Sequence, residues 1–150
     1  MTTPAMPIPH GSAWFMLPTR LAELEAMAIA PASMARRPSG EDEELPVDVG
    51  TDGVAILSIK GPMMRGPSWF HRMIGFVGYE DIIKAADIVE RDASVSSVVL
   101  HIDSPGGAVN GAMDARDALA RMSASKPTVA FTPGDMCSGG YLLATAANER

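Results

Sequence analysis

The sequence predicts an α/β fold with a parallel sheet built from βαβ units. Apolar runs of strand length alternate along the chain with segments whose apolar residues recur at helical spacing. The expected strands are residues 54–59, 98–102 and 128–131, and the expected helices are residues 79–92 and 108–122. A strand, a helix and a second strand in this order form a right-handed crossover, so we expect parallel strands with both faces of the sheet covered.

The first 50 residues are expected to precede this domain as a helical arm and a linker. Residues 1–17 contain several prolines and are expected to be a loose arm, and residues 18–30 are expected to be a helix with proline in its first turn. Residues 31–50 combine prolines, glycines and the acidic run 41–44, which is typical of a mobile linker. The domain itself is expected to span residues 51–150.

The segment between the first expected strand and the first expected helix, residues 63–78, is long and apolar for a loop. Its glycines are interspersed with large side chains, among them Trp69, Phe70, Met73 and Phe76. Such a segment either packs on its own domain or forms a substrate-binding or subunit-contact surface, and the sequence leaves both open.

Composition limits the possible classes of function. The chain has 150 residues, 47% of them apolar, which suits one domain with its own core. A formal charge of −6 and a scatter of Lys and Arg without a basic run predict no nucleic-acid partner. Cys137 is the only cysteine, and no Cys/His cluster has metal-site spacing, so no disulfide, metal or other cofactor is expected. Without a leader or an apolar run of about 18 residues, we expect a cytoplasmic protein with no membrane partner.

The turn after the third expected strand contains a candidate nucleophile, Ser138. The chain breaks at Pro133 and Gly134 and continues through Ser138, Gly139 and Gly140 into a segment with helical spacing. A serine at a helix start lies beside free backbone N–H groups, and two following glycines allow a substrate backbone to approach closely. Serine is also a preferred N-cap and Gly-Gly a common turn, so a purely structural role is the alternative.

A second glycine-rich turn, residues 103–107, follows the second expected strand and reads Asp-Ser-Pro-Gly-Gly. In a parallel sheet the turns at the carboxyl ends of the strands lie along one edge, so this turn should neighbour the one that carries Ser138. Its glycines offer unhindered backbone N–H groups, as an oxyanion hole requires.

Together the two turns resemble those of the signal peptide peptidase A family, serine peptidases of the ClpP/crotonase superfamily. The matching residues are 101–107, 126–127 and 137–141, with Ala144 to Asn148 after them. The resemblance covers about residues 53–150 and implies a ClpP/crotonase-like fold. It implies Ser138 as nucleophile and the N–H groups of Gly107 and Gly139 as the oxyanion hole. The remaining site-forming residues would shape the two turns: Asp103, Ser104, Pro105, Gly106 and Gly140.

The resemblance also implies a Ser-Lys dyad, in which a neutral lysine accepts the serine proton. In that family the lysine follows the serine by several tens of residues, so we expect the domain to be incomplete at its C-terminus and to lack this lysine. Within the chain, Lys60 ends a strand at the correct edge and is the alternative base, whereas Lys126 should lie at the opposite edge. His101 is expected to be a packed, hydrogen-bonded strand residue, and Cys137 a small buried residue.

Three functions follow as hypotheses. The first is a phage-type serine endopeptidase that processes scaffold or capsid protein as a homo-oligomer inside an assembling procapsid. The second is an inactive capsid-assembly or scaffold component that keeps the fold. The third is a crotonase-like acyl-CoA enzyme, against which Ser138 argues, because such enzymes usually need acidic residues at that helix start.

Overall fold

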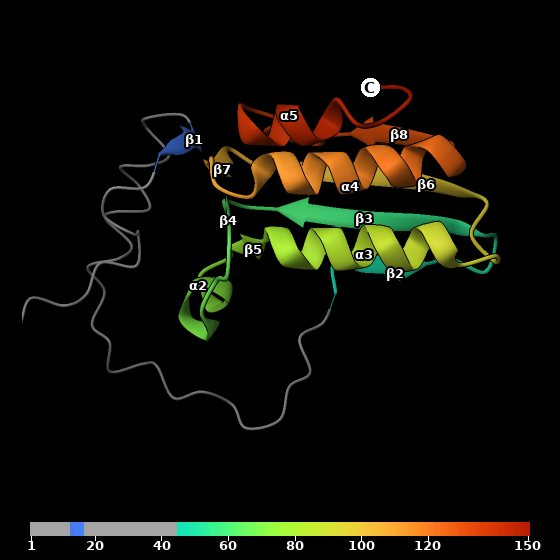
Figure 1. The fold of residues 1–150 in the computed structure, drawn as a ribbon, viewed down its shortest axis with the longest axis horizontal. Helices are drawn as coiled ribbons and strands as arrows, with labels where there is room; N and C mark the ends of the chain where they lie inside the picture. The colour runs from blue at the N-terminus through green and yellow to red at the C-terminus, as the bar shows by residue number, and fades with distance from the viewer. Residues whose placement is uncertain (1–12, 17–44) are drawn as a thin grey trace, which may run out of the picture.

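A computed structural model describes residues 13–16 and 45–150 (Figure 1). The helix expected over residues 18–30 and the acidic run 41–44 lie outside the described residues. The larger of two sheets has the strand order β2-β3-β6-β8, formed by strands Val47–Val49, Val54–Lys60, Ser97–Asp103 and Thr128–Phe131. Strands β3, β6 and β8 run parallel. The predicted α/β fold with a parallel sheet is therefore confirmed.

Strand β2 contradicts the expectation that residues 31–50 form a mobile linker throughout. It pairs antiparallel with β3, and the Cα partners are Val47 with Leu57 and Val49 with Ala55. The turn between the two strands is closed by the Gly50 N–H, which donates to the Val54 carbonyl at 2.9 Å. The last part of the expected linker is therefore an edge strand of the sheet.

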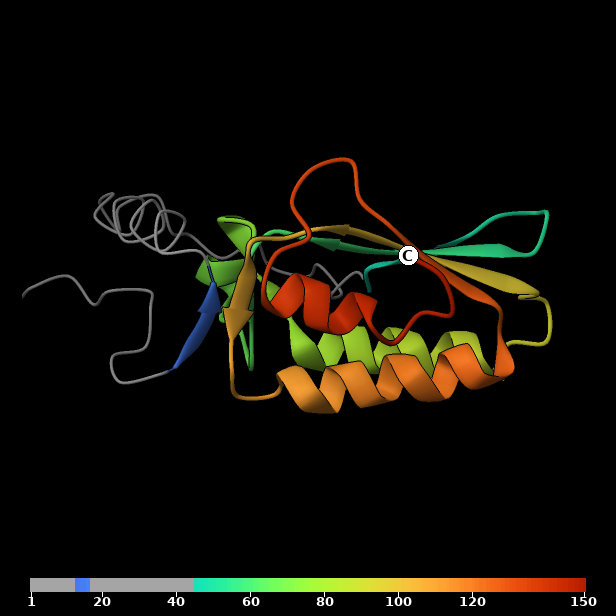
Figure 2. The same cartoon turned by 90° about the horizontal axis from the view of Figure 1, so that it is seen from above.

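Helices α3 (Tyr79–Arg91), α4 (Ala112–Ser125) and α5 (Gly139–Ala144) all lie on one side of this sheet (Figure 2). Strand alternation explains which side chains they cover. Leu57, Leu100 and Ala130 are at most 6% exposed, whereas Ile56 and Phe131, on the other face, are 43% and 54% exposed. The expectation that both faces are covered is wrong for the described residues. No helix in the described part of the chain has the length and apolar character needed to span a membrane.

A second, smaller sheet has the strand order β1-β7-β4-β5, and its strands are only two or three residues long. They are Trp14–Met16, Gly106–Ala108, Met63–Met64 and Val77–Gly78. Two expectations are corrected here. Residues 14–16, expected in a loose arm, form β1, and Ala108 belongs to β7 rather than to a helix. Helix α4 begins at Ala112, because the backbone of residues 106–108 is already paired in the sheet and Gly111 turns the chain with φ 95°.

The apolar segment of residues 63–78 folds onto its own domain as β4, helix α2 (Trp69–Met73) and β5. Met63, Met64 and Phe76 are at most 5% exposed, so these three side chains follow the first of the two alternatives that the sequence left open, packing on the domain. Met73 remains 49% exposed.

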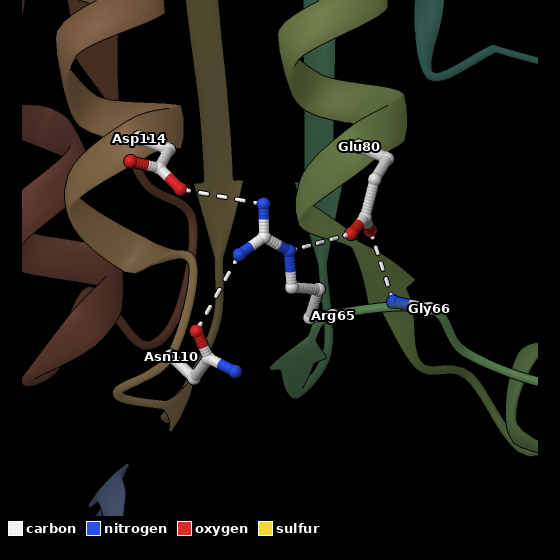
Figure 3. A network of polar contacts seen from close by, with 5 residues as sticks. All are labelled: Arg65, Gly66, Glu80, Asn110 and Asp114. Carbon is white, nitrogen blue, oxygen red and sulfur yellow. Dashed lines mark hydrogen bonds and ion pairs between the residues drawn. The ribbon is translucent and has the colours of Figure 1, made fainter.

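Arg65, between β4 and α2, joins this segment to the first turns of α3 and α4 (Figure 3). Its guanidinium lies 3.1 Å from a Glu80 oxygen, 3.5 Å from the Asn110 amide oxygen and 3.4 Å from an Asp114 oxygen. The Gly66 N–H donates to the other Glu80 oxygen at 2.9 Å. Partial burial raises the pKa of Glu80, but the Gly66 and Arg65 hydrogen bonds and the Arg65 charge outweigh it and lower that pKa below its usual value.

Candidate active site

The turns that follow β3, β6 and β8 are joined by hydrogen bonds at one edge of the larger sheet. The Gly61 N–H donates to the Asp103 carbonyl at 2.8 Å, and the Ser104 N–H donates to the Asp135 carbonyl at 2.6 Å. The Cys137 N–H donates to the Ser104 carbonyl at 3.1 Å. The carboxyl ends of the parallel strands therefore meet as the sequence predicts, and the turn before Ser138 lies beside the Asp-Ser-Pro-Gly-Gly turn.

Ser104 forms hydrogen bonds to several parts of this junction, a role that the sequence did not indicate. Its side chain is completely buried, and its hydroxyl donates to the Gly61 carbonyl at 2.7 Å. The same oxygen accepts from the Gly106 N–H at 3.2 Å. Ser104 thus ties the end of β3 to the residue before Gly107. A hydroxyl that donates and accepts at once can do this, and a methyl group cannot.

Asp103 holds the loop that leads from β8 to α5. Its carboxylate accepts from the Asp135 N–H at 3.0 Å, and the chain passes so closely that a Cβ on Gly134 would lie 2.7 Å from the same oxygen. The Asp103 carboxylate is therefore engaged in shaping the turn.

Ser138 has an unusual backbone conformation, with φ 50° and ψ −113°. It is the only non-glycine residue with positive φ in the described part of the chain. Such strain costs on the order of 1–3 kcal/mol and is typical of a nucleophile held on a sharp strand-to-helix turn. Ser138 occupies the N-cap position of α5, yet its hydroxyl makes no capping hydrogen bond, and the residue is exposed. The side chain therefore does not perform the usual role of an N-cap serine.

Gly139 and Gly107 lie against each other across the two turns. A Cβ on Gly139 would lie 3.3 Å from the Gly107 nitrogen and 3.4 Å from the Gly106 Cα. The start of α5 lies beside β7 in both views of the fold (Figures 1 and 2). The two glycines that the sequence analysis names therefore approach each other, and the exposed residue Ser138 directly precedes one of them.

Neighbouring backbone crowds the position that a Cβ would take at Gly107 and at Gly140. A Cβ on Gly107 would lie 2.1 Å from the Met63 carbonyl oxygen of β4, and a Cβ on Gly140 would lie 3.0 Å from the Ser104 carbonyl oxygen. Tyr79 supports β7 from α3, because its buried hydroxyl donates to the Ala108 carbonyl at 2.6 Å. Burial raises the pKa of Tyr79, so this hydroxyl keeps its proton across the ordinary pH range.

None of the residues considered as a general base contacts the Ser138 hydroxyl, which has no hydrogen-bond partner among residues 13–16 and 45–150. Lys60 ends β3 at this edge, exposed and in register with Asp103. Lys126 is at the opposite end of the sheet, where its ammonium donates to the Asp92 and Val95 carbonyls at 2.8 Å.

Two other expectations for side chains near the site need correction. The His101 Nε2 atom is buried and has no partner within the described residues, so this histidine is packed but not hydrogen-bonded through that atom; its ring lies 5.9 Å from the Phe131 ring. Cys137 is partly exposed rather than buried. Over the same residues, no three His, Cys, Asp or Glu side chains are grouped closely enough to hold a metal ion.

A comparison with protein families gives a match to the Clp protease model over residues 76–150, which is half of the chain. The chain belongs to the Clp protease family. This match confirms the expected ClpP/crotonase-like fold, and the matched residues begin directly before β5 and include Gly107, Ser138 and Gly139.

Curated relatives of this family member include two phage proteins and a bacterial protease. The chain is 35% identical to capsid assembly protease C of Escherichia phage lambda and 33% identical to head-tail preconnector protein GP5 of Enterobacteria phage P21, over 66% of this chain in both cases. It is 34% identical to Protease 4 of Salmonella typhi over 69% of its length. These matches confirm the resemblance. The chain spans only 23%, 20% and 16% of these three proteins.

Among solved structures, an enoyl-CoA hydratase/isomerase family member matches with a TM-score of 0.46 and 19% identity. The match covers 68% of this chain and 44% of the other. A likeness at that TM-score carries no argument for either fold or function.

Proposed function

We propose that this chain supplies the nucleophile and the oxyanion hole of a serine endopeptidase. The observation that carries the proposal is the strained backbone of Ser138 together with the close approach of Gly139 to the Gly107 nitrogen. In the proposed reaction the Ser138 oxygen attacks a peptide carbonyl, and the Gly107 and Gly139 N–H groups stabilise the resulting oxyanion. The amine product leaves, and water then hydrolyses the acyl-enzyme.

The proposed general base is a lysine, as in a Ser-Lys dyad. The 150 residues contain three lysines, and of these only Lys60 lies at the same edge of the sheet as Ser138. Lys60 is exposed, whereas the Ser-Lys dyad implied by the resemblance uses a buried lysine. The proposal therefore assigns the base to a lysine outside these residues and keeps Lys60 as the alternative within them.

The proposed substrate is a phage scaffold or capsid protein, cleaved by a homo-oligomer inside an assembling procapsid. The names of the two phage relatives, a capsid assembly protease and a head-tail preconnector protein, support this substrate class. The second name also favours the alternative function, an inactive component of head assembly. The two functions differ in whether Ser138 reacts.

A serine-reactive fluorophosphonate probe, with the labelled residue located by mass spectrometry, tests the proposal. The assay compares the 150-residue chain with any longer polypeptide that its reading frame encodes. We expect labelling at Ser138 that is lost in Ser138→Ala and kept in the neighbouring control Cys137→Ala. Labelling that persists in Ser138→Ala overturns the nucleophile assignment, and no labelling in any form favours the inactive assembly component.

The position of the base follows from the same assay. A positioned base contributes about 10²–10⁴-fold to the reaction, so its loss is easily measured. If the 150-residue chain is labelled and Lys60→Ala abolishes the labelling, then Lys60 is the base. If only a longer polypeptide is labelled, then the base lies outside the 150 residues.

A further inference from the structure

Strand β1 lies along the outer edge of β7, the edge that does not face β4; β7 is the strand that contains Gly107. The two strands run antiparallel (Figure 2). Phe15 lies opposite Gly107 and Trp14 opposite Ala108. On its other side β7 pairs with β4, where Met63 lies opposite Gly107. The candidate oxyanion residue is therefore enclosed between an internal strand and a three-residue strand from the N-terminal end of the chain.

The register shows which way the Gly107 N–H points. The Val109 N–H donates to the Ala13 carbonyl at 2.8 Å, so residues 13 and 109 form a hydrogen-bonded pair. In an antiparallel ladder, hydrogen-bonded and non-hydrogen-bonded pairs alternate, so residues 15 and 107 form the next hydrogen-bonded pair. The Gly107 N–H therefore faces the Phe15 carbonyl, and the Ala108 N–H faces β4.

A peptide substrate of the proposed enzyme needs the position beside β7 that β1 occupies, and it must run in the same direction as β1. Its scissile carbonyl must reach the Gly107 N–H, and the residues that precede that carbonyl can add an antiparallel strand to the outer edge of β7. Residues 13–15 already do this, with the Phe15 carbonyl at the Gly107 N–H. In this structure, β1 occupies the backbone position of the acyl side of a substrate.

We propose that the outer edge of β7 is a peptide-binding edge and that β1 is its built-in occupant, which an extended peptide substrate must displace. The inference rests on the proposed oxyanion role of Gly107. Displacement is feasible because β1 is short and its backbone hydrogen bonds each contribute only about 0.5–1.5 kcal/mol net. The occupied edge would keep the site closed to peptides that bind more weakly than β1.

The test measures peptide binding rather than hydrolysis, using chains that carry Ser138→Ala. The probe is a fluorescein-labelled peptide with the sequence of residues 11–17, and its binding is followed by fluorescence anisotropy. Phe15→Pro removes the N–H that pairs with the Gly107 carbonyl, which weakens β1. Met16→Pro is the matched control, because the alternation of the ladder directs the Met16 N–H away from β7.

We expect Phe15→Pro to bind the peptide up to about ten-fold more tightly than the parent chain, which is the full gain if β1 leaves the edge open about one tenth of the time in the parent. Met16→Pro should bind like the parent. Hydrogen exchange should show the Gly107 and Val109 amides losing protection in Phe15→Pro. The Ala108 amide, which faces β4, should keep its protection and report that the fold is intact.

Equal peptide affinity in Phe15→Pro and the parent, or no binding in either, overturns the inference. Unchanged hydrogen-exchange protection of the Gly107 and Val109 amides in Phe15→Pro also overturns it. If Ala108 also loses protection in Phe15→Pro, a chain without residues 1–16 takes its place, with the same expected outcomes. Probe labelling of Ser138 is a separate measurement. If Ser138 is labelled but Phe15→Pro and the parent chain bind the peptide equally, the proposed role of β1 is refuted. If Phe15→Pro binds the peptide more tightly but Ser138 is labelled neither in the 150-residue chain nor in a longer polypeptide, the proposed peptidase is refuted.

Discussion

The Ser104→Ala substitution tests whether the junction of the three turns stabilises the domain. Ser104 is completely buried, and its hydroxyl satisfies the Gly61 carbonyl at 2.7 Å and the Gly106 N–H at 3.2 Å. Alanine leaves both groups without this partner. The Gly106 amide is buried, so leaving it without a hydrogen-bond partner costs about 1–3 kcal/mol. The Gly61 carbonyl is partly exposed, so water can replace the hydroxyl there and the added cost is smaller. We expect a total loss of roughly 2–4 kcal/mol in the free energy of unfolding.

Equilibrium unfolding in urea, followed by circular dichroism, measures this loss. Ser96→Ala is the matched control: the Ser96 hydroxyl also donates to a turn carbonyl, that of Gly53 at 3.2 Å, but it is exposed, so the expected loss is at most about 0.5 kcal/mol. A Ser104→Ala chain within that same range of the parent would refute the reasoning, because the Gly61 and Gly106 groups would then be satisfied without the hydroxyl. Since Ser104 also holds the residue before Gly107, probe labelling of Ser138 should fall in parallel with stability.

Three further predictions concern the site and its support. Ser138→Gly should abolish labelling yet stabilise the fold by roughly 0.5–2 kcal/mol in urea unfolding, because relief of about 1–3 kcal/mol of backbone strain exceeds the entropic penalty of glycine; a destabilised variant would contradict the strained conformation. Gly139→Ala should slow labelling by about 10²-fold with little loss of stability, because the new Cβ would press on the Gly107 nitrogen at 3.3 Å. A normal labelling rate would show that the Gly107 N–H is not part of the site. Glu80→Gln should lower the urea midpoint near pH 7 but not near pH 3. Because the pKa of Glu80 is lowered in the folded chain, the stabilisation by its carboxylate is present above the unfolded pKa and is lost as the pH falls through the folded pKa. An equal effect of the substitution at both pH values would refute this.

The sequence alone determined the three parallel strands, the two long helices and the position of Ser138. These features depend on neighbours in the sequence. Residues 54–60 and 97–103 alternate between a buried and an open face, and α3 places its apolar residues at helical spacing, so local periodicity is enough to predict them. The glycines after Ser138 likewise indicate a sharp turn before any tertiary contact is known.

The tertiary structure alone decided the second sheet, the open face of the first and the role of Ser104. Strands β1, β7, β4 and β5 are two or three residues long, too short for a periodic pattern, and each forms only because a partner distant in the sequence supplies its hydrogen bonds. For the same reason the sequence placed residues 14–16 in a loose arm. A serine whose hydroxyl joins Gly61 to Gly106 has no local signature either, because the groups that it satisfies are brought together only when the strand ends meet.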